Sequence, residues 1–314
     1  MTTKPSDLHG VLVVDKARGP TSHDVVFQAR RALKTREIGH SGTLDPMATG
    51  VLVLVVGEAT KLVNHLMASR KVYETTLRLG QATSSLDADG DVVEERAVPT
   101  LSRELVARHA RTFLGEIDQQ VPAVSAVKVD GRPLYESARK GREVEAPVRR
   151  VCLHELDVLA VRENEIDLRM SCSKGFYVRS LGRDLAAALG TVGHLTALKR
   201  LQNGAFSIEQ AVDQERLRRA GQASDEERAA LRACVRPLAD VARSLSHVVL
   251  SEVGARHAFH GRVVPLADVL SETVVPDHEG GVRVGFDEQG KVLGLLERDV
   301  SGEGLRIVRG IRCG

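Results

Sequence analysis

Apolar and polar positions alternate or run together in several short segments of this chain, and these patterns predict strands. Segment 11–14 is a short apolar run that predicts a strand, and segment 51–56 is a longer aliphatic run, as expected for a strand that is buried on both faces. Segments 73–79 and 166–172 alternate instead, which is typical of half-buried strands. Segment 121–129 looks extended and ends in an Asp-Gly turn.

Apolar residues at helical spacing follow recognisable capping residues. A helix is predicted after Thr21 or Ser22, and another after Ser102. Segment 178–189 has the same spacing and is closed by a glycine. The charged segment 217–232 also has a helical pattern. The strands come in groups rather than in regular alternation with helices, so the sequence predicts an α+β fold with a mixed, largely antiparallel sheet and flanking helices.

The chain has 314 residues, of which 42% are hydrophobic, enough for one large core and a smaller one. A shift in composition near residue 245 leads into short strand-like runs with Gly and Pro turns. We therefore expect a large domain at 1–245 and a small β-rich domain at 246–314.

The formal net charge of +2 does not by itself indicate a nucleic-acid partner. Segment 169–203, however, contains basic residues with Asp184 as the sole acid, and segment 128–150 is also basic. Such patches suit phosphate contacts, although a positive run is also common on a solvated helix face.

The four cysteines form no C-x-x-C pair, and no histidines accompany them at ligand spacing. They are interpreted as buried or incidental thiols in a reducing compartment. The first nine residues lack a secretory apolar core, and the six-residue run at 51–56 is far too short to cross a bilayer. These features predict a cytoplasmic protein without a membrane anchor.

The segment with the clearest candidate chemistry is 39–52, in which glycines surround an Asp45-Pro46 pair before the buried strand. Glycines allow tight turns and close approach of a ligand, and proline keeps the preceding residue out of helical geometry. A single carboxylate on a rigid loop at the edge of a core suits a catalytic role. On the residue pattern alone, an Asp-Pro turn without a catalytic function is the favoured interpretation, because such turns are common.

Segment 39–52 resembles the G-H-x-G-x-L-D-P-x-A-x-G-x-L motif of bacterial TruB-type tRNA pseudouridine synthases. The resemblance continues in the family's order over about residues 10–205, with two departures, Ala17 where proline is usual and Phe176 where threonine is usual. The matching segments are V-V-D-K at 13–16, G-P-T-S-H-D at 19–24, G-E-A-T-K at 57–61, K-V-Y at 71–73, L-G-Q at 79–81, S-A-V-K at 125–128 and C-S-K-G-F-Y-V-R at 172–179.

The resemblance implies that Asp45 is the nucleophile that starts the isomerisation of uridine to pseudouridine. Arg179 matches the family's motif arginine and would keep that carboxylate ionised and aimed. A solvated or phosphate-contacting arginine is the alternative for Arg179.

The resemblance also assigns pocket residues. Tyr73 would stack on the target base and assist proton transfer, Tyr177 would be a second pocket aromatic, and His40 would help displace the target nucleotide. Lys128 and Leu198 would line the pocket. Four of them have a plainer alternative: Tyr73 as a core tyrosine, His40 as a loop-bonding histidine, Lys128 as a solvated lysine and Leu198 as a packed leucine.

For partners, the resemblance implies tRNA, with uridine 55 in the T-loop as the target and no cofactor or metal. Residues 119–150 correspond to the insertion that clamps the T-loop, and residues 246–314 to a PUA-like RNA-binding domain, in a protein expected to be a monomer. The basic residues of the insertion are Arg139, Lys140, Arg142, Arg149 and Arg150.

Three other functions are compatible with parts of the sequence. A tRNA-folding chaperone with the same fold is one, and a guide-RNA-dependent pseudouridine synthase is another. The third is a hydrolase that uses Asp87 and Asp89. These two residues precede Gly90 in a pattern that favours an open hairpin turn over a calcium loop.

Overall fold

The structure is a computed structural model that describes residues 7–125, 127–129, 131–134, 145–221, 224–275 and 281–312. The chain forms two compact units. The first unit consists of Met1–Pro46, Gly50–Ser69 and Asn203–Gly314, and the second of Met47–Thr49 and Arg70–Gln202.

In the first unit, strand β1 pairs along its whole length with β3, in antiparallel register. The opposite edge of β1 pairs with β14 in parallel register and with β15 in antiparallel register. Strand β2 pairs with the other edge of β3. The residues of β3 from 50 to 56 are all buried, which confirms the prediction from the unbroken aliphatic run. The bounds are β1 (Gly10–Lys16), β2 (Ile38–His40), β3 (Thr49–Val56), β13 (Phe206–Ser207), β14 (Val212–Asp213) and β15 (Arg236–Pro237).

Helix α1 begins with a complete capping box: Thr21 Oγ1 accepts from the backbone N–H of Asp24, and the Asp24 carboxylate accepts from the backbone N–H of Thr21. The helical segment predicted at 217–232 is two helices, α6 and α7. The bounds in this unit are α1 (Ser22–Leu33), η1 (Gly57–Leu62), α2 (Val63–Met67), η2 (Ile208–Gln210), α6 (Gln214–Ala220), α7 (Asp225–Arg232), α8 (Leu238–Arg243), α9 (Glu252–Phe259) and η3 (Leu266–Asp268).

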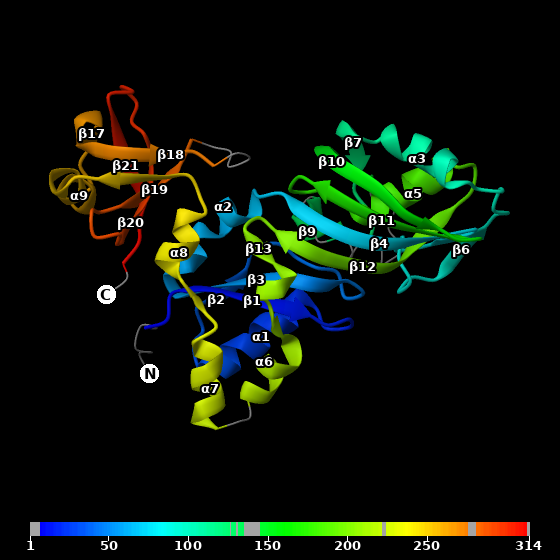
Figure 1. The fold of residues 1–314 in the computed structure, drawn as a ribbon, viewed down its shortest axis with the longest axis horizontal. Helices are drawn as coiled ribbons and strands as arrows, with labels where there is room; N and C mark the ends of the chain where they lie inside the picture. Colours follow the sequence, from blue (N-terminus) through cyan, green and yellow to red (C-terminus); the bar gives the residue numbers. More distant parts are fainter. Residues whose placement is uncertain are drawn as a thin grey trace. The chain divides into compact units, whose positions relative to one another are not determined.

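The C-terminal residues form a six-stranded sheet in the order β17-β21-β20-β19-β16-β18 (Figure 1). The predicted boundary at 245 falls between α8 and β16, and buried residues from both sides share one core that includes Val53, Val241 and Phe286. Helix α9, which the sequence pattern did not predict, packs Ala258 into a second core with Val248. The strands are β16 (His247–Leu250), β17 (Val264–Pro265), β18 (Val269–Thr273), β19 (Arg283–Phe286), β20 (Val292–Arg298) and β21 (Gly304–Gly310).

The second unit is built on strands in the order β12-β4-β11-β10-β7, with helices α3 and α5 on one side (Figure 1). The alternating segments 73–79 and 166–172 form the antiparallel pair β4 and β11, as predicted. The bounds are β4 (Lys71–Leu79), β5 (Gln81–Thr83), β6 (Val92–Glu95), α3 (Arg103–Arg111), β7 (Gly115–Gln120), β8 (Lys128–Val129), β9 (Arg132–Pro133), β10 (Val148–Val161), β11 (Glu165–Cys172), α5 (Val178–Ala188) and β12 (Gly193–Asn203).

Two features of this unit differ from the sequence predictions. Strands β10 and β12 were not predicted. The register of β10 against β11 shifts between Leu153 and Glu155 and again between Val158 and Ala160, so its alternation of buried and exposed residues is broken. Among the described residues of the extended segment predicted at 121–129, Lys128–Val129 form a strand, which pairs with β9, and the others do not. The mixed α/β architecture with a β-rich C-terminal part is confirmed.

Candidate active site

Asp45 lies on the loop between β2 and β3, and both of its chain neighbours are held by the N-terminal segment. The Ser22 hydroxyl donates to Leu44 O at 3.0 Å and accepts from Leu44 N at 2.9 Å. On the other side, Pro46 O accepts from Gly19 N at 2.8 Å. Asp45 itself is half-buried. The backbone is therefore fixed on both sides of this carboxylate.

Two buried polar side chains anchor the same loop. The ammonium group of Lys16, which is fully buried, donates to Ala17 O at 3.0 Å and to Pro46 O at 3.2 Å. At the start of the loop, Asn203 Nδ2 donates to Ser41 O at 2.9 Å. Burying such groups is unfavourable unless they find partners, and here their partners include backbone carbonyls of the loop.

Arg179 is the second residue of α5, in the first turn of a helix as predicted, and is only 4% exposed. Its Nη1 donates to Ser85 O at 2.7 Å, and its Nη2 donates to Val124 O at 3.0 Å. The same Nη1 lies 3.5 Å from Asp87 Oδ2. This burial excludes the alternative of a solvated arginine, and the contacts fix the plane of the guanidinium group.

Asp87 is a residue of this site that the sequence analysis missed. It was placed in an open turn, and the β5–β6 hairpin turn is confirmed, but Asp87 is buried. Its carboxylate pairs with Arg179 and accepts from the Ser85 hydroxyl and from Asp89 N. A β-bridge between Asp87 and Leu195 holds the turn against the start of β12. An Asp-x-Asp-Gly turn has the same sequence pattern whether it faces solvent or the interior, so no signal distinguished it.

The two predicted site tyrosines lie on rigid elements of the second unit. Tyr73 is in β4 opposite Met170 of β11 and is buried. Tyr177 immediately precedes α5, and Gln119 holds its backbone from both sides. Gln119 Nε2 donates to Tyr177 O at 3.0 Å, and Gln119 Oε1 accepts from Tyr177 N at 2.7 Å. This buried glutamine, also missed by sequence reasoning, fixes the start of the helix that carries Arg179.

The remaining predicted site residues are distributed over both units. His40 ends β2, and its ring lies edge-on to His23 with the centroids 5.5 Å apart. Leu198 is a buried residue of β12, and its carbonyl lies 3.5 Å from Thr49 Oγ1. Lys128 belongs to β8, but its side chain is outside the described atoms.

Within each unit, the structure brings some of the predicted residues close together. Tyr177 and Arg179 stand at the same end of α5, while Tyr73 and Leu198 come from the neighbouring strands β4 and β12. The first unit contains Asp45 and His40. The second unit contains the other predicted site residues, Tyr73, Lys128, Tyr177, Arg179 and Leu198.

A buried lysine and a buried cysteine face each other at the end of a strand pair. Lys71 of β4 is opposite Cys172 of β11. Burial, together with the nearby Arg200 cation, lowers the pKa of the Lys71 ammonium group to about 8. Burial raises the pKa of the Cys172 thiol to about 12, so this thiol has little nucleophilic character at neutral pH.

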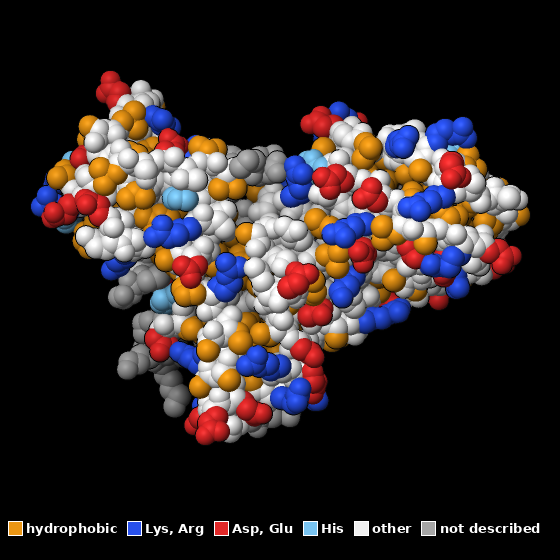
Figure 2. Space-filling model, viewed as in Figure 1, with side chains coloured by type: hydrophobic (Ala, Val, Ile, Leu, Met, Phe, Trp, Pro, Cys, Tyr) orange, Lys and Arg blue, Asp and Glu red, His pale blue; other side chains and the backbone are white. Residues whose placement is uncertain are grey.

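The basic segment 169–203 is less available to phosphates than its sequence suggested. Arg179 and Arg200 are buried, and Arg183 pairs with Asp184 at 2.8 Å. Figure 2 shows Lys and Arg interspersed with Asp and Glu over the visible face. A charge run in sequence is therefore partly internal once the segment folds.

The ends of the predicted insertion lie side by side on β7 and β10, where Gln120 pairs with Val148. Arg150 lies between Glu116 at 3.2 Å and Asp118 at 3.4 Å, and both acids partly neutralise it. The other basic residues assigned to the clamp, Arg139, Lys140 and Arg142, lie outside the described residues, and Arg149 lies in β10.

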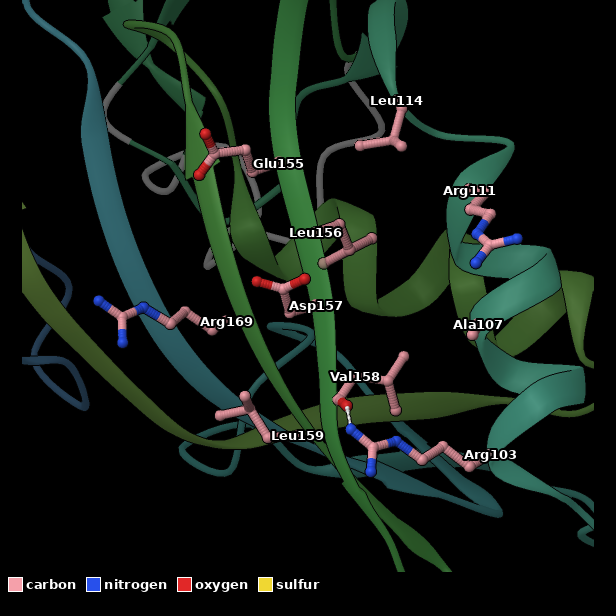
Figure 3. A pocket seen from close by; sticks show the side chains of 10 residues that line it. All are labelled: Arg103, Ala107, Arg111, Leu114, Glu155, Leu156, Asp157, Val158, Leu159 and Arg169. Atoms are coloured by element: carbon pink, nitrogen blue, oxygen red, sulfur yellow. Dashed lines mark hydrogen bonds between the residues drawn. The ribbon is translucent and has the colours of Figure 1, made fainter.

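A separate groove of about 760 Å³ lies between α3 and β10 (Figure 3). Arg103 reaches from α3 and donates to Val158 O of β10 at 2.7 Å. None of the predicted site residues lines this groove.

Neither a metal cluster nor a membrane-spanning helix is found in the described part of the chain. No group of three His, Cys, Asp or Glu side chains is arranged to hold a metal ion there. No helix in the same residues is long and apolar enough to span a membrane.

The fold is similar to that of two solved complexes, one that contains Cbf5 and one that is an H/ACA RNP. A Cbf5-Nop10-Gar1 complex superposes with a TM-score of 0.75 at 20% identity, covering 98% of this chain and 86% of that one. An H/ACA RNP bound to a substrate RNA containing 2′-deoxyuridine gives a TM-score of 0.72 at 18% identity, covering 99% and 92%. At these identities the likeness shows a shared fold.

Sequence comparisons are more specific. The model of the TruB family pseudouridylate synthase N-terminal domain matches residues 30–178, and that of the tRNA pseudouridylate synthase B C-terminal domain matches residues 179–242. The chain is 46% identical to tRNA pseudouridine synthase B of Ralstonia pickettii over 83% of this chain and 81% of that protein. It is 43% identical to the protein of the same name from Thermobifida fusca over 92% and 94%. The chain therefore belongs to the TruB family of pseudouridylate synthases and is an isomerase.

Proposed function

We propose that this chain isomerises uridine 55 in the T-loop of tRNA to pseudouridine, with Asp45 as the nucleophile. The observation that carries the proposal is the fixed backbone on both sides of Asp45, at the motif position of the family. Relatives that share 43% to 46% of their residues with this chain are named tRNA pseudouridine synthase B, which supports tRNA as the substrate.

A carboxylate can form a covalent bond to an electrophilic carbon and later leave it. On one route Asp45 adds to the uracil ring, and on the other the base departs first through a glycal. Both routes break the C1′–N1 bond, rotate the uracil and form a bond from C1′ to C5, and the proton that C5 loses is balanced by the proton that N1 gains. The reaction conserves all atoms and electrons, so it consumes no oxidant, reductant or co-substrate.

The other site residues have distinct roles in this proposal. Arg179, held by Asp87, takes the part of the family's motif arginine and supplies a fixed positive charge for the reaction. Tyr73 stacks on the uracil and assists transfer of the C5 proton. Tyr177, Lys128 and Leu198 line the pocket.

The target uridine must leave its stack before it reacts, which costs on the order of a few kcal/mol. In the proposal His40 fills the vacated space and offsets part of this cost. The insertion at 119–150 clamps the T-loop, and residues 246–314 act as a PUA-like RNA-binding domain. The enzyme works as a cytoplasmic monomer.

Two other functions remain to be compared with this one. For a guide-RNA-dependent synthase the comparisons offer no specific support, because the solved structures of similar fold are 18% to 20% identical and indicate the fold alone. Two proteins named tRNA pseudouridine synthase B are 43% to 46% identical over most of the chain. The stand-alone activity is therefore the better supported. A tRNA-folding chaperone is compatible with the isomerase because both roles require binding and opening of the T-loop.

The test is to incubate purified protein with an unmodified tRNA transcript, without guide RNA or metal, and to map pseudouridine by carbodiimide-dependent primer-extension stops. We expect one stop, at position 55, with wild-type protein and none with Asp45→Asn. Asp91→Asn, which alters an exposed aspartate of the β5–β6 hairpin, is the matched control and should be fully active.

The outcomes separate the parts of the proposal. A stop elsewhere refutes the T-loop assignment, and a transcript with cytidine at position 55 should give none. An active Asp45→Asn variant refutes the nucleophile but not the reaction. Tight tRNA binding without any pseudouridine would favour the chaperone.

A further inference from the structure

One hydroxyl group from α1 satisfies both backbone groups of the residue that precedes Asp45. Ser22 is 1% exposed, and its Oγ donates to Leu44 O at 3.0 Å and accepts from Leu44 N at 2.9 Å. The neighbouring Thr21 already caps the helix, so Ser22 is not needed for that purpose.

These two bonds constrain the geometry of Asp45 directly. The Leu44 carbonyl belongs to the peptide plane that contains Asp45 N, so holding this oxygen fixes the plane from which the Asp45 side chain projects. On the other side, Gly19 N and Lys16 Nζ donate to Pro46 O. Leu44 lies in a tight loop outside any ladder, where a buried N–H and C=O depend on side-chain partners.

We infer that Ser22 is a positioning residue that aims the Asp45 carboxylate by holding the Leu44 peptide. The inference rests on the proposed function, because it assumes that Asp45 is the reacting group. Ser22 contacts the loop backbone, so its effect should appear in the rate of the chemical step and leave tRNA affinity unchanged.

The first test is Ser22→Ala, which removes both hydrogen bonds and leaves the cap intact. Displacing a reacting group by about 1 Å can lower a rate about 100-fold, so we expect a single-turnover rate about 10- to 100-fold lower at saturating enzyme. The dissociation constant for tRNA, measured by filter binding, should stay within about twofold of wild type because the RNA-contacting surface is unchanged. Ser22→Thr keeps a hydroxyl and should recover most of the rate.

Thr21→Ala is the matched control. It removes the adjacent hydroxyl, whose Oγ1 accepts from Asp24 N at 3.1 Å and donates to Asp24 Oδ2 at 2.7 Å, and it does not alter the bonds to Leu44. It weakens the same helix end, so a rate loss caused by helix fraying alone would appear in both variants. All rates are measured at a temperature where circular dichroism shows each variant to be folded. If Ser22→Ala does not fold, Ser22→Cys fills nearly the same space with a weak hydrogen-bonding group.

The inference is overturned if Ser22→Ala matches wild type, if Thr21→Ala loses as much rate, or if Ser22→Thr is as slow as Ser22→Ala. Asp45→Asn is assayed in parallel, so that a failure of the nucleophile assignment can be distinguished from a failure of the positioning role of Ser22. Full activity of Asp45→Asn would refute the nucleophile assignment itself. An inactive Asp45→Asn beside a fully active Ser22→Ala would refute the positioning role alone.

Discussion

Replacing Asp87 by asparagine should damage both stability and catalysis through Arg179. The substitution keeps the shape of the side chain and removes its charge. The amide oxygen of the new side chain can still accept from Asp89 N, but an uncharged group now faces the guanidinium group whose Nη1 lies 3.5 Å from the native carboxylate.

The size of the effect follows from burial. The Arg179 and Asp87 side chains are 4% and 6% exposed. Removing one partner of such a pair costs about 3–5 kcal/mol because the remaining charge is uncompensated. Arg179 retains the carbonyls of Ser85 and Val124, so we expect the lower end, about 3 kcal/mol. At about 2–4 °C per kcal/mol for a domain of this size, the melting temperature should fall by about 6–12 °C.

The assay combines thermal unfolding with single-turnover pseudouridine formation at about 20 °C, a temperature chosen so that the variant stays folded. We expect a rate about 10- to 100-fold below wild type, because the guanidinium group loses its orientation. Asp91→Asn, at an exposed position of the same hairpin, should change neither quantity. A variant with wild-type melting temperature and rate would show that the Asp87–Arg179 pair contributes neither to stability nor to orientation, and would refute this reasoning.

Two further predictions concern buried groups of the second unit. Gln119→Leu leaves Tyr177 N and O without their side-chain partner, so the free energy of unfolding should drop by about 1–3 kcal/mol in denaturant titration, and Gln120→Leu at the exposed neighbour should have no such effect. Because the pKa of the Cys172 thiol is raised to about 12, its thiolate fraction at about pH 8 is about 10⁻⁴. Iodoacetamide should then label the half-buried Cys152 but not Cys172 in native protein, and both in urea, as read by peptide mass spectrometry. Equal labelling of both in native protein would contradict the burial.

Local patterns in the sequence were sufficient wherever a strand or helix keeps a regular relation to the core. The unbroken run at 51–56 and the alternation at 166–172 correspond to β3 and β11. Periodicity did not reveal β10, whose two register shifts break the alternation, or the short helix α9, which contains a glycine.

The candidate site residues also fall into two groups, those that sequence motifs indicated and those that only the folded structure revealed. The ordered motifs indicated Asp45 and Arg179 as candidate site residues, and their settings in a loop and in a first helical turn were predicted. Ser22, Asp87 and Gln119 were not assigned a role in the site, because their importance comes from partners far along the chain. Leu44 lies 22 residues from Ser22, and Tyr177 lies 58 residues from Gln119.

The sequence by itself determined the family, the strand and helix patterns and the candidate carboxylate, because these depend on residue type and on spacing over a few neighbours. The tertiary structure decided which polar groups are buried and what they bind. Asp87 and Asp91 flank the same hairpin turn, yet the first is buried against Arg179 and the second is exposed. Burial and pairing are set by chain segments that meet only on folding, and the cost of an unpaired buried group makes those distant partners essential.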